Sequence, residues 1–143
     1  EEPTDFFVRA DAPILIAQYM QGQEAVPSGA GDPSMALAVP VPQYRSEYIF
    51  TASKTYDSNF INVIIPAGAV VTLDGADLTD PWQDVGDSGF AVIRHELSTE
   101  GTDVHHISAD APFGLMVYGY GRFTSYMYPG GLDLNRITVV PPI

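Results

Sequence analysis

The chain has 143 residues, of which 45% are hydrophobic, and this composition is typical of one folded domain and argues against a disordered protein. Six basic and 18 acidic side chains give a formal net charge of −12, which excludes the cationic surface that a nucleic-acid-binding protein needs. The sequence contains no cysteine, so disulfides, thiol catalysis and cysteine-ligated metal sites are excluded as well.

Further features of the sequence bear on the cellular compartment of the protein. No apolar run approaches the roughly 20 residues that a membrane-spanning helix needs. The first residues, Glu1-Glu2-Pro3-Thr4-Asp5, lack the basic and apolar regions of a signal peptide. A cysteine-free chain of this size is typical of a cytosolic protein, or of an exported bacterial protein whose core needs no disulfides.

Short runs of β-branched and aromatic residues alternate with clusters of Gly, Pro, Asp, Ser and Asn, whereas helical spacing is nearly absent. Along the chain, this pattern predicts about eleven short strands: Phe6–Arg9, Pro13–Gln21, Met35–Val39, Glu47–Ser53, Phe60–Ile65, Val70–Leu73, Gly89–His95, Val104–Ser108, Phe113–Gly119, Thr124–Tyr128 and Ile137–Val140. We therefore predict an all-β fold, an antiparallel β-sandwich of two sheets with a jelly-roll-like arrangement. It would form a single domain over residues 1–143, with residues 140–143 starting a linker.

A short motif occurs twice, as Ala10-Asp11-Ala12-Pro13 and as Ala109-Asp110-Ala111-Pro112. Proline fixes φ and has no N–H group, so it suits the first residue of a strand. Each copy is followed by an apolar stretch. We therefore predict that each copy is a turn that leads into a buried strand.

The clearest hairpin pattern covers residues 61–75. Pro66-Ala67-Gly68 is a turn sequence between two apolar runs, and Asp74-Gly75 is a favoured tight turn at the end of the second run. Polar and glycine-rich stretches predict loops at Gln23–Pro33, Ala76–Ser88 and Ser98–Asp103. We expect contacts with a partner to come from the first two of these loops.

Three blocks of residues follow one another in an order that points to a family. The first holds Gly31-Asp32-Pro33-Ser34-Met35, Pro40, Pro42, Gln43-Tyr44 and Tyr48-Ile49-Phe50, and the second holds Tyr56, Phe60-Ile61-Asn62-Val63, Pro66, Gly68 and Leu73-Asp74-Gly75. The third holds His106-Ile107, Ala111-Pro112-Phe113-Gly114-Leu115-Met116-Val117-Tyr118-Gly119-Tyr120 and Ser125-Tyr126-Met127-Tyr128-Pro129-Gly130-Gly131-Leu132. From about Asp11 to Leu134, the chain resembles the IgG Fc-binding protein N-terminal domain family.

The resemblance implies a β-rich extracellular binding or adhesion module without catalysis. Members of this family are domains of secreted or surface proteins, often bacterial and often one module of a longer chain. The name of the family does not by itself assign an antibody ligand to this chain.

The sequence offers one weak sign of catalysis. Gly86-Asp87-Ser88-Gly89 copies the nucleophile motif of chymotrypsin-like proteases. All three histidines, however, follow Ser88 in the chain, whereas that protease family places its histidine before the serine. We therefore interpret the motif as turn residues and predict that the protein is not an enzyme.

Carboxylates and histidines raise the question of metal ions. Asp74, Asp77 and Asp80 lie at a spacing of three, and irregular acidic segments of this kind supply oxygen ligands to Ca²⁺. A solvated acidic loop is the alternative. His105 and His106 are adjacent in a predicted strand and therefore point to opposite faces, while His95 could meet one of them across strands. We predict no cofactor, with calcium as the one ion that the acidic segment could take.

Aromatic residues gather near the C-terminus, at Tyr118, Tyr120, Phe123, Tyr126 and Tyr128. Tyr118 and Tyr120 would share one face of a strand, as would Tyr126 and Tyr128. Such rings form a cross-strand ladder that stabilises the sheet, or an exposed platform for a sugar or a protein.

For a ligand site, the predicted contacts are Tyr120, Tyr126, Tyr128 and Trp82, the only tryptophan. We predict a non-catalytic extracellular binding or adhesion module of a larger exported surface protein. Its partner would be a protein or a glycan on a host, prey or neighbouring cell, without nucleic acid and without membrane insertion. The alternative is a structural subunit of a surface filament or layer that self-associates through exposed strand edges.

Overall fold

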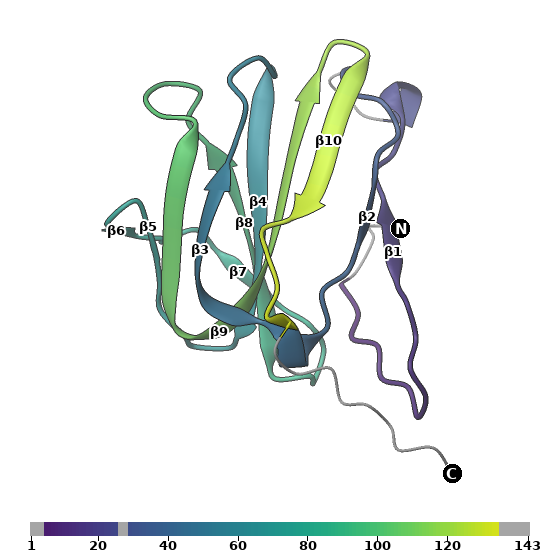
Figure 1. Ribbon diagram of the computed structural model, residues 1–143, viewed down its shortest axis with the longest axis vertical. Coiled ribbons are helices and arrows are strands. Elements are labelled where there is room, and N and C mark those ends of the chain that lie inside the picture. The colour runs from purple at the N-terminus through teal and green to yellow at the C-terminus, as the bar shows by residue number, and fades with distance from the viewer. Residues whose placement is uncertain (1–4, 26–28, 135–143) are drawn as a thin grey trace.

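The computed structural model describes residues 5–25 and 29–134, and it is built almost entirely of strands (Figure 1). The strands are β1 (Ala17–Tyr19), β2 (Met35–Leu37), β3 (Arg45–Thr51), β4 (Ser58–Pro66), β5 (Val71–Leu73), β6 (Ala76–Asp77), β7 (Trp82–Asp84), β8 (Phe90–Leu97), β9 (Val104–Gly121) and β10 (Thr124–Pro129). Two short 3-10 turns lie at η1 (Gln23–Ala25) and η2 (Val41–Gln43). The predicted all-β fold of antiparallel sheets is confirmed. No helix within the described ranges is long and apolar enough to cross a membrane.

Strand β9 organises the molecule because it belongs to two layers. Its first half pairs with β3 on one side and β5 on the other, and β6 extends this first layer beyond β5. Its second half pairs with β4 and β10, and β8 and β7 extend this second layer beyond β4. Figure 1 shows β9 curling at the bottom of the molecule as it passes from one layer to the other.

The bend of β9 contains the second copy of the repeated motif. Pairing with β5 ends at Ala109, and pairing with β4 resumes at Gly114. Pro112, which has no N–H to donate, lies where the ladder is interrupted. The predicted strands Val104–Ser108 and Phe113–Gly119 are therefore one bent strand, and the prediction of a turn that leads into a separate strand is wrong here.

The first copy of the motif lies in a different environment. Residues 10–13 and the following Ile14 and Leu15 are exposed, and β1 begins only at Ala17. The predicted buried strand Pro13–Gln21 is therefore wrong in part: only Ala17–Tyr19 forms a strand, and its residues are exposed. The predicted strand Phe6–Arg9 is also not formed, and the ring of Phe7 stacks on that of Phe90 at 6.0 Å between centroids. The predicted strand Ile137–Val140 and the linker at 140–143 lie outside the described residues.

The turn at Pro66-Ala67-Gly68 forms, with a hydrogen bond from the Ala69 amide to the Pro66 carbonyl, but it does not close the predicted hairpin. Strands β4 and β5 both pair with β9 and not with each other, so this turn carries the chain from the second layer to the first. The Asp74-Gly75 turn is confirmed: it joins β5 to β6, and both residues have positive φ values of 51° and 83°.

The core lies between the two layers. Strand β4 alternates half-buried and buried residues along its whole length, as a strand with one face in the core should. The inner faces contribute fully buried side chains at Ile61, Val63, Ile107, Phe113 and Val117. Burying side chains of this size stabilises a fold by roughly 1.5–3 kcal/mol each.

The two strands β1 and β2 form a separate ribbon, visible beside β10 in Figure 1. Ala36 of this ribbon packs with Met116 and Met127 on the outer face of the second layer. A backbone hydrogen bond of 2.8 Å from the Gly31 amide to the Gly121 carbonyl ties the chain before β2 to the end of β9. The ribbon therefore adds a small third layer over β10 and the second half of β9.

Candidate functional site

The structure does not bring the three predicted contact tyrosines together. Residues directly opposite each other in an antiparallel pair share a face. Tyr120 lies opposite Ser125, on the outer face beneath the ribbon, whereas Tyr126 and Tyr128 lie opposite Gly119 and Val117 on the inner face. No single platform can therefore contain all three rings.

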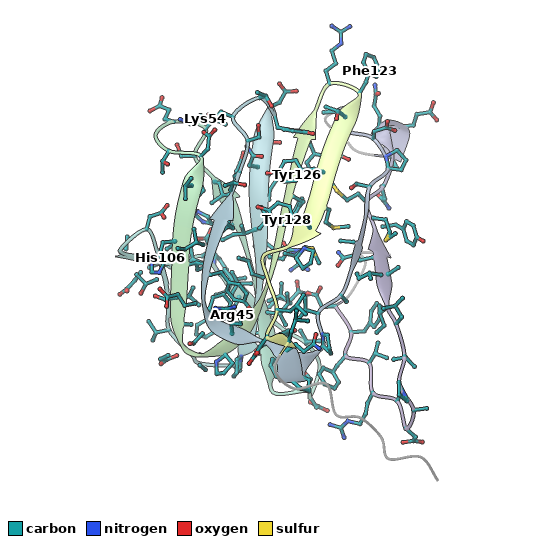
Figure 2. All side chains as sticks on the ribbon, viewed as in Figure 1. Arg45, Lys54, His106, Phe123, Tyr126 and Tyr128 are labelled. Carbon is teal, nitrogen blue, oxygen red and sulfur yellow. The ribbon has the colours of Figure 1, made fainter. Side chains whose placement is uncertain are left out.

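Tyr126 and Tyr128, the two tyrosines on the inner face of β10, lie between the two layers at the edges formed by β3 and β10. Their rings stack with centroids 5.9 Å apart, and Figure 2 shows both side chains on β10. The Tyr126 hydroxyl donates to Asn59 Oδ1 at 2.6 Å, and the Tyr128 hydroxyl donates to the Thr51 carbonyl. Burial raises the pKa of Tyr126 to about 12. These contacts favour the ladder interpretation for this pair.

Tyr120 belongs to an outer aromatic cluster with Phe60 and Tyr118. The Phe60 and Tyr118 rings stack at 5.4 Å, and Tyr120 meets each of them edge-on at 6.0 Å. Gly31 covers part of Tyr120, and a Cβ added there would lie 2.8 Å from Cδ1 of the ring, at a φ of +103°. This site accepts only glycine without rearrangement, so the ring of Tyr120 is held against the segment that precedes β2.

Trp82 remains accessible. It lies on β7, the edge strand of the second layer, opposite Ile93 of β8, and 55% of its surface is exposed. The predicted loop Ala76–Ser88 is wrong in part, because β6 and β7 both form inside it. Trp82 is therefore held by strand pairing and not by a free loop.

The three aspartates of the predicted calcium site have separate partners, and that of Asp77 is the Thr72 hydroxyl, which donates to Oδ1 at 3.5 Å. Asp74 accepts hydrogen bonds from His105 Nδ1 at 2.7 Å and from the His106 amide at 2.8 Å, and Asp80 pairs with His95 Nδ1 at 2.8 Å. Within the part of the chain that the structure describes, no three His, Asp or Glu side chains are placed to hold a metal ion. Calcium binding stays a prediction, and this arrangement does not favour it.

Two of the histidines line the same cavity. His95 and His105 line one cavity of about 400 Å³ between the edges of the two layers, together with Leu73, Leu78 and Glu100. His105 is buried and stacks on Phe50 at 5.2 Å, whereas the exposed His106 bonds Glu47 Oε1 at 2.6 Å. The predicted opposite orientation of His105 and His106 is confirmed.

Asp74 makes the stability of this region sensitive to acid. Partial burial opposes ionisation, but the hydrogen bonds from His105 and His106 outweigh it and lower the pKa of Asp74 below its ordinary value. A lowered pKa in the folded state stabilises the fold above the ordinary carboxyl pKa of about 4, and this stabilisation is lost as the pH falls through the folded-state pKa.

We therefore expect Asp74→Asn to lower the free energy of unfolding at pH ~7 and to have a smaller effect at pH ~3. Asparagine tolerates the positive φ of this turn position, so the backbone should be preserved. Urea denaturation at the two pH values measures the difference. An effect of Asp74→Asn that is equal at both pH values would contradict the role of the carboxylate charge.

The end of the sandwich opposite the bend of β9 carries a set of loops (Figure 1). There the β3–β4, β8–β9 and β9–β10 connections lie at one end of the sandwich, and Figure 2 places Lys54 and Phe123 at this end. Lys54 Nζ donates to the Gly101 carbonyl and lies 3.5 Å from Asp103 Oδ1, so it joins the β3–β4 loop to the β8–β9 loop. Phe123 is 63% exposed in the two-residue turn between β9 and β10.

Sequence reasoning counted Phe123 only as one ring of the aromatic series. The signal that could have distinguished Phe123 from the other rings is its position in a two-residue turn, with Arg122-Phe123 between Gly121 and Thr124. Such turns favour glycine, asparagine or aspartate, so an aromatic residue here is unexpected.

Of the comparisons with known proteins, only the one with protein-family models found a match. Searches of curated proteins and of solved structures gave no significant match. A family model described as IgGFc binding protein matches residues 1–119, which is most of the 143-residue chain. The chain therefore belongs to the IgGFc binding protein family.

Proposed function

We propose that this chain is a non-catalytic extracellular module that binds a protein partner, as one part of a larger exported surface protein. The observation that carries the proposal is membership of a family described by its binding to the Fc part of immunoglobulin G, over residues 1–119. The Fc fragment is therefore the first partner to test.

The architecture supports a binding role. The bent strand β9 fixes both layers, and the connections at one end are tied to this framework by Lys54 and by the Gly31–Gly121 hydrogen bond. Binding residues are commonly carried by connections that a rigid scaffold positions. Exposed aromatic side chains are present at Trp82 and Phe123, and aromatic residues dominate the energetics of protein interfaces.

We expect the immobilised protein to bind Fc fragments and not Fab fragments in biolayer interferometry. Fc from which the N-linked glycan has been removed separates the two partner classes, because binding that survives this treatment is to the protein surface. Loss of binding on deglycosylation would support a glycan ligand instead. Absence of Fc binding at micromolar concentrations would contradict Fc as the partner.

Trp82→Ala belongs in the same experiment because Trp82 is the most accessible of the predicted contacts. Weaker Fc binding by this variant would place the partner at the β7 edge. Unchanged binding would remove Trp82 from the contact surface.

A second candidate, self-assembly into a surface layer, is favoured by the ribbon. Tyr19 and Met35 lie opposite each other on its outward face, as do Ala17 and Leu37, and the three larger side chains are 43–71% exposed. An apolar face on a two-stranded ribbon is a candidate for pairing with a second copy. Light scattering across a concentration series tests this candidate and also serves as a control for the binding assay. A monomer at every concentration would contradict self-assembly.

A further inference from the structure

The turn between β9 and β10 places an aromatic residue in a conformation that favours glycine. Gly121 pairs with Thr124, so only Arg122 and Phe123 connect the two strands. Phe123 has a φ of +56°, in the left-handed region that bulky side chains rarely adopt. Glycine or asparagine would adopt this conformation at lower cost. Phe123 is therefore not the residue that would make this turn most stable.

The side chain of Phe123 also contributes little to the core. It is 63% exposed, and Figure 2 shows it at the far end of the β9–β10 hairpin, beyond the sandwich. The guanidinium carbon of Arg122 lies 5.3 Å from the centroid of its ring, within the range of a cation–π interaction. We call Arg122 and Phe123 the tip. The tip presents a flat apolar surface together with a positive charge.

The hairpin that carries the tip is held on both sides. Besides the Gly31–Gly121 backbone bond, the Ser125 hydroxyl donates to the Asp32 carbonyl, and the Tyr56 and Thr124 hydroxyls lie 3.4 Å apart. The tip is therefore presented in a fixed position. A rigid aromatic side chain loses little conformational entropy on binding, which is the property of an anchor residue in an interface.

We infer that the tip is the anchor of the partner-binding surface, an inference that rests on the proposed function. The ring of Phe123 enters an apolar pocket of a protein partner, and Arg122 pairs with a carboxylate on the rim of that pocket. The chain carries only six basic residues, and both Lys54 and Arg94 are engaged with its own aspartates, Asp103 and Asp5. Arg122 instead lies beside an exposed ring, where it adds charge specificity to an apolar contact.

The experiment compares three single-residue variants with the wild-type chain. Phe123→Asn removes the ring and suits the left-handed backbone, Phe123→Tyr keeps an aromatic face, and Ile49→Ala removes a 70% exposed apolar side chain from the outer side of β3. Each variant is measured by thermal unfolding and by binding to Fc fragments.

We expect Phe123→Asn to raise the unfolding midpoint by roughly 2–4 °C, because the backbone strain is relieved. We expect the same variant to weaken Fc binding by at least about tenfold, whereas Phe123→Tyr and Ile49→Ala bind like the wild type. Equal Fc binding by Phe123→Asn and the wild type would overturn the inference.

The unfolding measurement keeps the inference testable without a bound partner. If the wild type does not bind Fc, Fc is not the partner. The unfolding midpoint of Phe123→Asn then still tests whether Phe123 is kept at the tip for a reason other than stability. A lower midpoint would show that Phe123 stabilises the fold and would overturn the inference. A higher midpoint would show that the chain keeps an aromatic residue there at the expense of stability, and would support it.

Discussion

Replacing Phe113 with alanine is expected to lower the free energy of unfolding by about 3–5 kcal/mol. Phe113 is fully buried where β9 bends between the two layers, opposite Arg45 in the ladder with β3. Its ring meets that of Tyr48 edge-on at 4.9 Å, and its carbonyl accepts a hydrogen bond of 2.5 Å from the Tyr48 hydroxyl. Alanine would leave a cavity at the point where both layers share one strand.

Urea denaturation followed by circular dichroism measures this loss. Ile49→Ala is the matched control, since it removes a 70% exposed side chain from neighbouring β3 and should change stability by less than about 0.5 kcal/mol. Phe113→Leu should lie between the two because it fills part of the cavity. A loss below about 1 kcal/mol for Phe113→Ala would show that the bend is not closely packed.

Replacing Asn59 with alanine is expected to lower the free energy of unfolding by about 2–4 kcal/mol, because a buried side chain loses two hydrogen bonds together. Asn59 is 2% exposed; its Nδ2 donates to the Ser53 carbonyl at 3.0 Å, and its Oδ1 accepts from the Tyr126 hydroxyl at 2.6 Å. This side chain therefore connects β4, the β3–β4 loop and β10. Removing it leaves the Tyr126 hydroxyl and the Ser53 carbonyl without this partner.

A double-mutant cycle with Tyr126→Phe separates the two hydrogen bonds. Tyr126→Phe alone should cost about 1–2 kcal/mol, and its effect should shrink in the Asn59→Ala background because the two groups share one bond. The cycle also tests the role predicted for Tyr126. If Tyr126→Phe leaves stability unchanged but abolishes Fc binding, the hydroxyl acts at an interface and not in the ladder.

The sequence predicted well those features that depend on neighbouring residues. The β-branched and aromatic run at residues 60–65 lies within β4, and Asp74-Gly75 forms the tight turn that its composition favours. The shared face of Tyr126 and Tyr128 also follows from the two-residue period of a strand.

Features that depend on distant pairing could not be predicted in this way. Pro112 interrupts the strand pattern, so the two halves of β9 looked like separate strands, and only their partners β4 and β5 show that they are continuous. The opposite faces of Tyr120 and Tyr126 depend on the register across the β9–β10 turn. Likewise, the partners of Asp74 and Asp80 come from β9 and β8, so the acidic spacing alone could not show their engagement with histidines.

The central position of β9 has a consequence for how the chain is made. Strands β3, β4 and β5 all pair with β9, so β5 cannot complete its pairing until synthesis has passed residue 109, β3 until residue 113, and β4 until residue 120. Contacts between such distant segments form slowly, because a long loop must close first. The nascent chain therefore carries unpaired strand edges through most of translation, and its conversion to the native state is a late event that begins when this one segment arrives.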